Sequence, residues 1–382
     1  MWRFRLKLMP YRQRAGLALI SMVCVVSVWL LWVARGQAED AAVTVEIAST
    51  PSLEHLRPHM DLARVTLLAL LHSKPLGQGH MKVQLTAPPR TTVLATDLPR
   101  VEGTPLLAFD SELIDGSVTL QYRFPIRGTY TFDLEITPVP GGPVFPPTNL
   151  RQTVRISEKP VIIRQIWLRV VGLFVLGVIT GGLVARFAAA RTKLQSQAIV
   201  VLLGLCSGVL VPVSTVSAHP GHIHGADHAA QGHQVIRGDD GWELEIRTSP
   251  EPATVGYPVQ LDLWLRKDGV VFPDMTAVSI AATNLEAGQT VVETHILARQ
   301  GQTTQSLQLY DGGLHTIAVT VRPVGGAANG WVPPTAMLNV DIVALYPPLA
   351  VQIRMIAIVL GVLGLGMVVG FCVPRLALCP RR

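Results

Sequence analysis

The chain has 382 residues, of which only 15% are charged, and its mean hydropathy is positive at +0.38. This composition excludes an ordinary soluble globular protein and favours a membrane protein. The formal net charge of +6 does not require a nucleic-acid partner, because the basic residues gather beside apolar segments, where membrane topology explains them.

The N-terminus combines a basic tail, residues 1–14, with an apolar run over residues 15–33. A helix of about 20 apolar residues crosses the hydrocarbon core of a bilayer, so we expect a first membrane span here. We interpret this span as an uncleaved anchor. The alternative is a secretory signal, for which ARGQA, residues 34–38, offers a cleavage site.

A polar region over residues 38–160 follows, and its short alternating runs predict a β-sandwich. We interpret the acidic residues Asp110, Glu112 and Asp115 as a solvated turn. The expected strands are Val43 to Ala48, Ala63 to Leu71, Met81 to Ala87, Val118 to Phe124, Gly128 to Thr137 and Gln152 to Ile156.

Two histidine–methionine pairs in this region are candidates for a secondary metal site. His59 precedes Met60, and His80 precedes Met81. Imidazole with a soft thioether suits copper, provided that the two loops converge. The alternative is a pair of surface histidines beside packing methionines.

Three further apolar runs predict spans over residues 166–185, 198–217 and 351–373. Short segments rich in Lys and Arg stay on the cytoplasmic side. This rule places the tail 1–14, the loop 186–197 and the tail 374–382 inside. We therefore expect a multi-pass protein of a bacterial inner membrane with both termini in the cytoplasm and two periplasmic domains.

The spans contain no Asp, Glu, Lys or His at their centres, which argues against a transporter acting alone. Pairs of glycines spaced as G-x-x-x-G permit close helix packing, although composition alone can also produce them. These pairs are Gly177 and Gly181, Gly204 and Gly208, and Gly366 and Gly370.

A histidine-rich linker, residues 218–234, begins where the third span ends. Imidazoles a few residues apart can close on one Cu, Ni or Zn ion with little loss of loop entropy. We expect a labile transition-metal site here, with copper and nickel ahead of zinc, because thiolates are absent. Its expected ligands are His219, His222, His224, His228 and His233, with Asp227 as an auxiliary ligand.

Two alternatives remain open for this linker. It is a plain polar spacer if its histidines reflect composition only. Cleavage after Ala218 would instead make His219 a new N-terminus, whose free amine could chelate Cu(II).

The second polar region, residues 235–346, predicts another sandwich with a hairpin turn at Asp268 and Gly269. About seven short strands with close turns in each region are typical of an immunoglobulin-like sandwich. The expected strands are Trp242 to Arg247, Val259 to Leu265, Thr276 to Ala281, Thr290 to Leu297, Thr303 to Leu309, Gly313 to Pro323 and Met337 to Ile342.

The ends of the two polar regions match in order, which predicts a duplication. GTYTFDLEITPVPGG matches GLHTIAVTVRPVGG, FPPT matches VPPT, and IRQI matches IRMI at the start of the next span. The predicted repeating unit is a membrane helix, a β-sandwich and a second membrane helix.

Two short resemblances accompany these patterns. GYPVQLDLWLRKDGVV with DGGLHTIAVTV resembles the FixH and YtkA-like group of membrane-tethered β modules, which implies a role near copper or cation transport. AHPGH resembles the mature start of HupE/UreJ nickel permeases, which implies capture of the ion by the first histidines.

The chain lacks G-x-S-x-G, H-E-x-x-H and P-loop motifs, so we do not expect an enzyme. The hypothesis is a membrane protein that binds copper or nickel for delivery, sensing or support of transport, in contact with a membrane or periplasmic protein partner. The rivals are a metal-independent interaction scaffold and an accessory subunit of a metal permease or cation pump.

Overall fold

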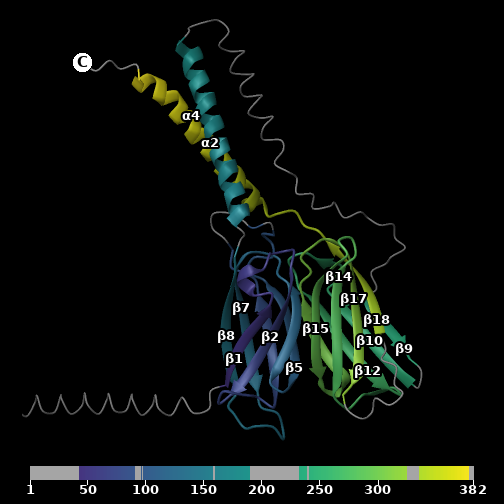
Figure 1. Cartoon of the computed structure of the whole chain (residues 1–382). Helices are drawn as coiled ribbons and strands as arrows, with labels where there is room; N and C mark the ends of the chain where they lie inside the picture. Colours follow the sequence, from purple (N-terminus) through teal and green to yellow (C-terminus); the bar gives the residue numbers. More distant parts are fainter. Residues whose placement is uncertain are drawn as a thin grey trace, which may run out of the picture.

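The computed structural model describes residues 43–90, 96, 98–157, 160–189, 232–238, 241–324 and 335–377. The expected spans over residues 15–33 and 198–217 lie outside these residues. The described chain is mostly β, with two long helices above one end of a β body (Figure 1).

The first half of the β body contains eight strands and a short 3-10 helix, followed by a long helix. These are β1 (Val43–Thr50), η1 (Leu53–His55), β2 (Leu62–Leu71), β3 (Lys74–Pro75), β4 (Gln78–Thr86), β5 (Pro105–Ile114), β6 (Ser117–Arg123), β7 (Gly128–Thr137), β8 (Thr148–Ile156) and α2 (Pro160–Ala189).

The second half begins in the expected linker and also ends in a long helix. Its elements are β9 (His233–Arg237), β10 (Trp242–Ser249), β11 (Ala253–Thr254), β12 (Val259–Lys267), β13 (Val270–Val271), β14 (Thr276–Asn284), β15 (Gln289–Ala298), η3 (Arg299–Gly301), β16 (Gln302–Leu307), β17 (Gly313–Pro323), β18 (Thr335–Val343) and α4 (Leu349–Ala377).

The same pairing order occurs in both halves. In the first, β1, β2 and β6 form one layer, and β5, β4, β7 and β8 form the other. In the second, β10, β12 and β16 form one layer, and β15, β14, β17 and β18 form the other. Each half is therefore a two-layer sandwich. In both halves the strand before the last three, β5 or β15, belongs to the layer of the strand that precedes it, β4 or β14.

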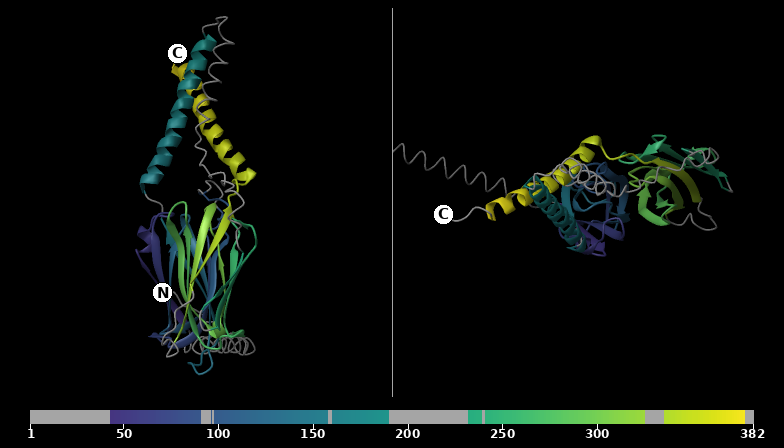
Figure 2. Two further views of the ribbon diagram at one scale, coloured as in Figure 1. Left: turned by 90° about the vertical axis from the view of Figure 1, so that its right-hand side faces the viewer. Right: turned by 90° about the horizontal axis from the view of Figure 1, so that it is seen from above.

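The two sandwiches are joined by strand pairing. β5 pairs with β16, and β6 pairs with β15, both antiparallel. One layer thus runs β8-β7-β4-β5-β16-β12-β10-β9, and the other runs β1-β2-β6-β15-β14-β17-β18-β11. The halves lie side by side (Figure 2).

The core lies between these layers, because alternate residues of each strand point inward. β17 shows the pattern: Ile317, Val319 and Val321 are buried, and the residues between them are partly exposed. One continuous cluster of buried apolar side chains includes residues of both halves. The expected turn is present too, since Asp268 and Gly269 both have positive φ between β12 and β13.

One long strand, β5, was missing from the sequence prediction, as were the short strands β3, β9, β11 and β13. β5 carries Asp110 and Glu112 on one face, and these charges suggested a turn. The strand forms because Phe109 and Leu113, on either side of this pair, point into the core. Its absence from the prediction matters, since β5 is one of the four strands that join the halves.

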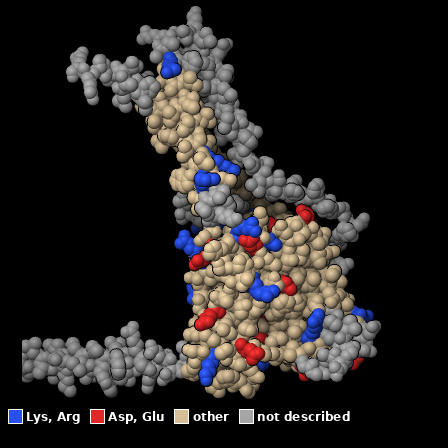
Figure 3. Space-filling model, viewed as in Figure 1, with Lys and Arg blue, Asp and Glu red and all other residues tan. Residues whose placement is uncertain are grey.

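The two long helices contain segments long and apolar enough to cross a membrane, Ile163–Arg186 and Leu349–Cys372. Three residues separate β8 from α2, and five separate β18 from α4. Both helices therefore leave the same end of the body. Figure 3 shows basic side chains at the two ends of the helix pair and none along its middle, as expected for a spanning segment.

α2 and α4 pack closely through their glycines. A side chain at Gly177 would overlap the carbonyl oxygen of Leu363, and one at Gly181 would overlap that of Met367. Side chains at Gly366 and Gly370 would overlap the backbone of α2 in the same way. The G-x-x-x-G pairs of these two helices thus form a contact between them.

Candidate functional site

The histidine-rich linker lies mostly outside the described residues, which include neither His219, His222, His224 and His228 nor Asp227. His233 is described and is the first residue of β9, which pairs with β10 and has no second partner among the described strands. The end of the linker is therefore fixed to the β body by backbone pairing.

The side chain of His233 also has a partner. Its Nε2 lies 3.1 Å from Oε1 of Glu245, which is only 4% exposed. Arg247 and Arg266 pair with the same carboxylate, at 2.6 and 3.1 Å. Burial opposes ionisation of Glu245, but hydrogen bonds from Arg247 and His233 outweigh it and lower its pKa. His233 is thus part of a charged cluster on the outer face of β9, β10 and β12.

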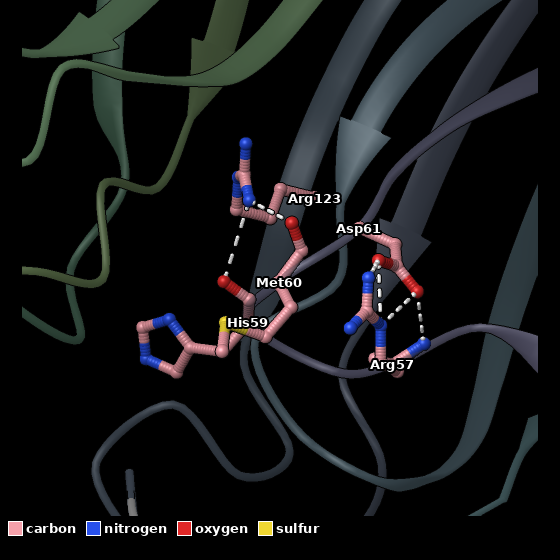
Figure 4. Close-up of polar contacts among 5 residues, drawn as sticks. All are labelled: Arg57, His59, Met60, Asp61 and Arg123. Atoms are coloured by element: carbon pink, nitrogen blue, oxygen red, sulfur yellow. Dashed lines mark hydrogen bonds and ion pairs between the residues drawn. The ribbon is translucent and has the colours of Figure 1, made fainter.

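We call the boundary between the halves, where β5 pairs with β16 and β6 pairs with β15, the seam. The first histidine–methionine pair lies on this seam (Figure 4). His59 has a positive φ of 67°, and its Nε2 lies 3.6 Å from Oδ1 of Asp311 in the other half. Its ring also meets Tyr310 edge-on. The Met60 side chain is 63% exposed. Imidazole and carboxylate therefore meet here, at the end of the body nearer the helices.

Arg123 connects the two halves at this seam, and no motif in the sequence marks it. The side chain is 9% exposed, its Nη1 donates to the carbonyl oxygens of His59 and Met60, and its Nε donates to that of Thr290 at 3.0 Å. The Tyr310 hydroxyl donates to the Arg123 carbonyl oxygen at 2.9 Å. A buried guanidinium thus links the loop of His59 and Met60 in the first half to β15 in the second.

The second histidine–methionine pair does not support a shared site. His80 and Met81 are neighbours on β4, so their side chains point to opposite faces of the sheet. Met81 is fully buried in the core, whereas His80 is partly exposed. His80 pairs with Thr137 at the end of β7 far from the helices, so the His59 and His80 loops do not converge.

His80 instead lines a groove at the far end of the seam, with a volume of about 500 Å³. The groove opens because β5 and β16 pair only at residues 107–109 and 305–307 and then diverge. One wall carries His80, Asp110 and Glu112, and the other carries Trp264, Gln302 and Thr304. The groove is open to solvent, and its lining is more polar than apolar.

Glu112 closes the inner side of this groove, which corrects its interpretation as a solvated turn residue. It is 5% exposed and pairs with Arg299 of η3 at 2.6 Å. Beside it, the Leu297 N–H donates to the Ser111 hydroxyl at 3.0 Å. Asp110 and Asp115 are exposed, as expected.

The repeat places a buried histidine where the first half has a tyrosine. The Tyr130 hydroxyl bonds back to the backbone of Ile126, whose N–H lies 3.0 Å away, in a tyrosine corner. His315 occupies the matching position, and its Nδ1 lies 3.1 Å from the carbonyl oxygen of Gly313. Its Nε2 is buried with no hydrogen-bond partner among the described residues.

Within the described ranges, no group of three or more His, Cys, Asp or Glu side chains is arranged to hold a metal ion. The metal ligands expected from the sequence therefore remain predictions, with only His233 placed. The secondary set His59, Met60, His80 and Met81 is divided between the two ends of the seam.

No family model and no curated protein matches the chain. Solved structures resemble parts of it at low similarity. A conjugative transposon lipoprotein from Bacteroides eggerthii is 14% identical over 26% of this chain and 96% of its own length, with a TM-score of 0.19. A DUF4426 family protein from Pseudomonas aeruginosa is 14% identical over 30% and 98%, with a TM-score of 0.19.

A CARDB domain from Pyrococcus furiosus, solved in complex with di-metal ions, is 14% identical over 30% of this chain and 90% of its own length, with a TM-score of 0.18. At such low TM-scores, none of these structures indicates a function for the chain.

Proposed function

We propose that the chain is a membrane-anchored protein that binds a transition metal, copper or nickel, through the segment from His219 to His233. The observation that carries the proposal is the spacing of five histidines within fifteen residues, because closing so short a segment around one ion loses little loop entropy. Backbone pairing of β9 with β10 and the contact with Glu245 place the end of this segment on the β body.

In this proposal the two sandwiches are periplasmic, and both termini are cytoplasmic. The basic segments beside the apolar runs support this orientation. The common exit of α2 and α4 from one end of the body agrees with it, because an exported body must then hang from the bilayer by that end.

We also propose that the two halves arose by duplication of one membrane-tethered, immunoglobulin-like unit. Their identical pairing order and the matching sequence ends support this origin. The seam supports it further. β5 corresponds to β15 and β6 to β16, so the pairs β5–β16 and β6–β15 are the same contact made twice, as in a symmetric dimer of two identical units.

Within the metal site, His219, His222, His224 and His228 are the proposed primary ligands, with Asp227 auxiliary. His233 uses Nε2 for Glu245, so it joins the ion through Nδ1 or anchors the segment. Neutral imidazoles are required, so affinity falls below about pH 6.

The test is a calorimetric titration of the detergent-solubilised full chain with Cu(II), Ni(II) and Zn(II). We expect binding at micromolar affinity or tighter, lost when the four primary histidines are replaced by alanine. His295→Ala is the matched control, because that imidazole is half-exposed and contacts Glu293 on β15. Unchanged binding by the fourfold variant would remove the proposed site.

The groove favours a second candidate, a scaffold that binds another protein or a small ligand without metal. Trp264 and Thr304 face His80 and Asp110 across it, which gives an aromatic surface beside hydrogen-bonding groups. Partners that remain bound in the presence of chelators, and are lost on Trp264→Ala, would favour this candidate. An accessory subunit of a permease or cation pump would be recognised by co-purification with that transporter.

A further inference from the structure

Two short tethers, residues 157–159 before α2 and residues 344–348 before α4, keep one end of the β body close to the bilayer. If the helices are spans, as proposed above, the links of three and five residues limit the gap to about 10–20 Å, because an extended residue covers about 3.3–3.6 Å. The polar layer of a bilayer is itself several ångströms thick on each side. The loops at this end therefore lie within reach of lipid headgroups.

These loops expose apolar side chains. Met60, before β2, is 63% exposed, and Leu285, after β14, is 48% exposed. Tyr257, before β12, is 56% exposed, and Tyr346, before α4, is 76% exposed. Strand register places all four at the helix-proximal end, since Leu62 pairs with Arg123, Asn284 with His315, and Val259 with Leu307.

Within the part of the chain that the structure describes, exposed aromatic side chains lie at this end of the body and on the adjoining helix. Among the described residues, only Trp167, Tyr257 and Tyr346 are aromatic and more than half exposed. Trp167 lies near the start of the apolar segment of α2, and the two tyrosines lie in the adjacent loops. The far end exposes aliphatic residues such as Val144 but none of these aromatics. Tyr and Trp concentrate at membrane–water interfaces.

Basic side chains at this end of the body can contact the phosphate groups of lipids. Arg164 and Arg169 are exposed in the first turns of α2, on either side of Trp167. Arg100 donates from Nε to the carbonyl oxygen of Tyr346 at 2.8 Å, which ties the second tether to the β body. Arginine at this depth pairs with lipid phosphate.

We infer that this end of the β body, with Met60, Tyr257, Leu285 and Tyr346, rests in the lipid headgroup layer. The inference depends on the membrane anchoring proposed above and goes beyond it, because anchoring alone would let the body move away from the membrane on its tethers. Contact through both halves holds the composite sandwich at a fixed height and tilt.

The test uses the full chain with its four cysteines replaced by serine, reconstituted in vesicles of phosphatidylethanolamine and phosphatidylglycerol. A bimane label is attached to Tyr257→Cys or, as the matched exposed control at the far end, to Val144→Cys. Lipids with a nitroxide on the headgroup then quench the label by proximity. We expect quenching at residue 257 to exceed that at residue 144 about twofold or more, and Leu285→Cys to behave like residue 257.

Equal quenching at residues 257 and 144, in a chain that resists extraction by alkaline carbonate, would overturn the headgroup contact and leave the anchoring intact. Extraction of the chain by carbonate would overturn the anchoring and the contact together.

Discussion

Arg123 is the residue on which the joining of the two halves depends most. Replacement by methionine keeps the length of the side chain but removes its hydrogen bonds to His59, Met60 and Thr290. Hydrogen bonds to a charged donor contribute about 1.5–3 kcal/mol each when their loss leaves buried acceptors unpaired. We therefore expect Arg123→Met to lower the free energy of unfolding by about 2–5 kcal/mol, measured by denaturant titration of tryptophan fluorescence.

Arg151→Met is the matched control for this variant. Arg151 also pairs by hydrogen bond, with Asp133 at 2.6 Å, but its side chain is 72% exposed. An exposed ion pair contributes little to stability. Equal unfolding midpoints for the two variants would show that Arg123 does not hold the seam.

His315 should make the protein sensitive to acid. Burial lowers its pKa, although the Gly313 carbonyl and the carboxylates of Asp311, Glu286 and Asp341 oppose the shift. In the unfolded chain a histidine titrates near pH 6.5, so below that pH the unfolded state binds more protons than the folded state. The free energy of unfolding should therefore decrease as the pH falls from about 6.5.

His315→Tyr tests this assignment, because the matching Tyr130 forms a tyrosine corner. We expect the melting temperature of the variant to fall less between pH 7.5 and 5.5 than that of the natural chain. His55→Gln, which changes an exposed imidazole, should leave the pH dependence unchanged. If His315→Tyr has the same pH dependence as the natural chain, another group causes the sensitivity.

The close contact of α2 with α4 can be tested with paired glycines on one helix. Gly366 lies against Phe174 and Gly177 of α2, whereas Gly364 has nothing within 4 Å of where a side chain would start. Gly366→Ile should therefore force the helices apart, and Gly364→Ile should not. Distances between spin labels at the exposed positions Leu168 and Ile356, in a cysteine-free chain, report the separation. Equal distances in both variants would contradict this packing.

The sequence was most informative about regular elements. Alternation of apolar and polar residues located most long strands, and length with hydropathy located α2 and α4, because both signals are local. β5 was missed because its outward charges, Asp110 and Glu112, resemble a turn until Arg299 of the other half is known to neutralise Glu112. β9 was missed as a whole, since His233 was assigned to the linker, whereas it pairs with β10.

The joining of the halves could not be predicted, because it depends on contacts between distant residues. The sequence predicted two separate sandwiches, whereas the strands pair across the seam and the buried apolar cluster is continuous. No local pattern marks Arg123 or Tyr310, because each forms its hydrogen bond with a backbone carbonyl oxygen in the other half, that of Thr290 or Arg123. The metal ligands are still predicted from sequence alone, apart from the position of His233.

A continuous core predicts that the two halves unfold together. Differential scanning calorimetry of the full chain in detergent should show one transition for the β body, with the calorimetric enthalpy close to the van't Hoff enthalpy. Two separate transitions, each with the enthalpy of one sandwich, would show that pairing of β5 with β16 and of β6 with β15 does not couple the halves.

The proposed function requires the β body to lie outside the cytoplasmic membrane, and Val144 allows a direct test. It is 95% exposed at the far end of the body, and neither polar region of the chain contains a cysteine. In a chain with serine at its four natural cysteines, Val144→Cys should react with a membrane-impermeant maleimide in intact cells whose outer membrane has been permeabilised. Labelling only after the inner membrane is lysed would place the body in the cytoplasm and contradict the proposed function.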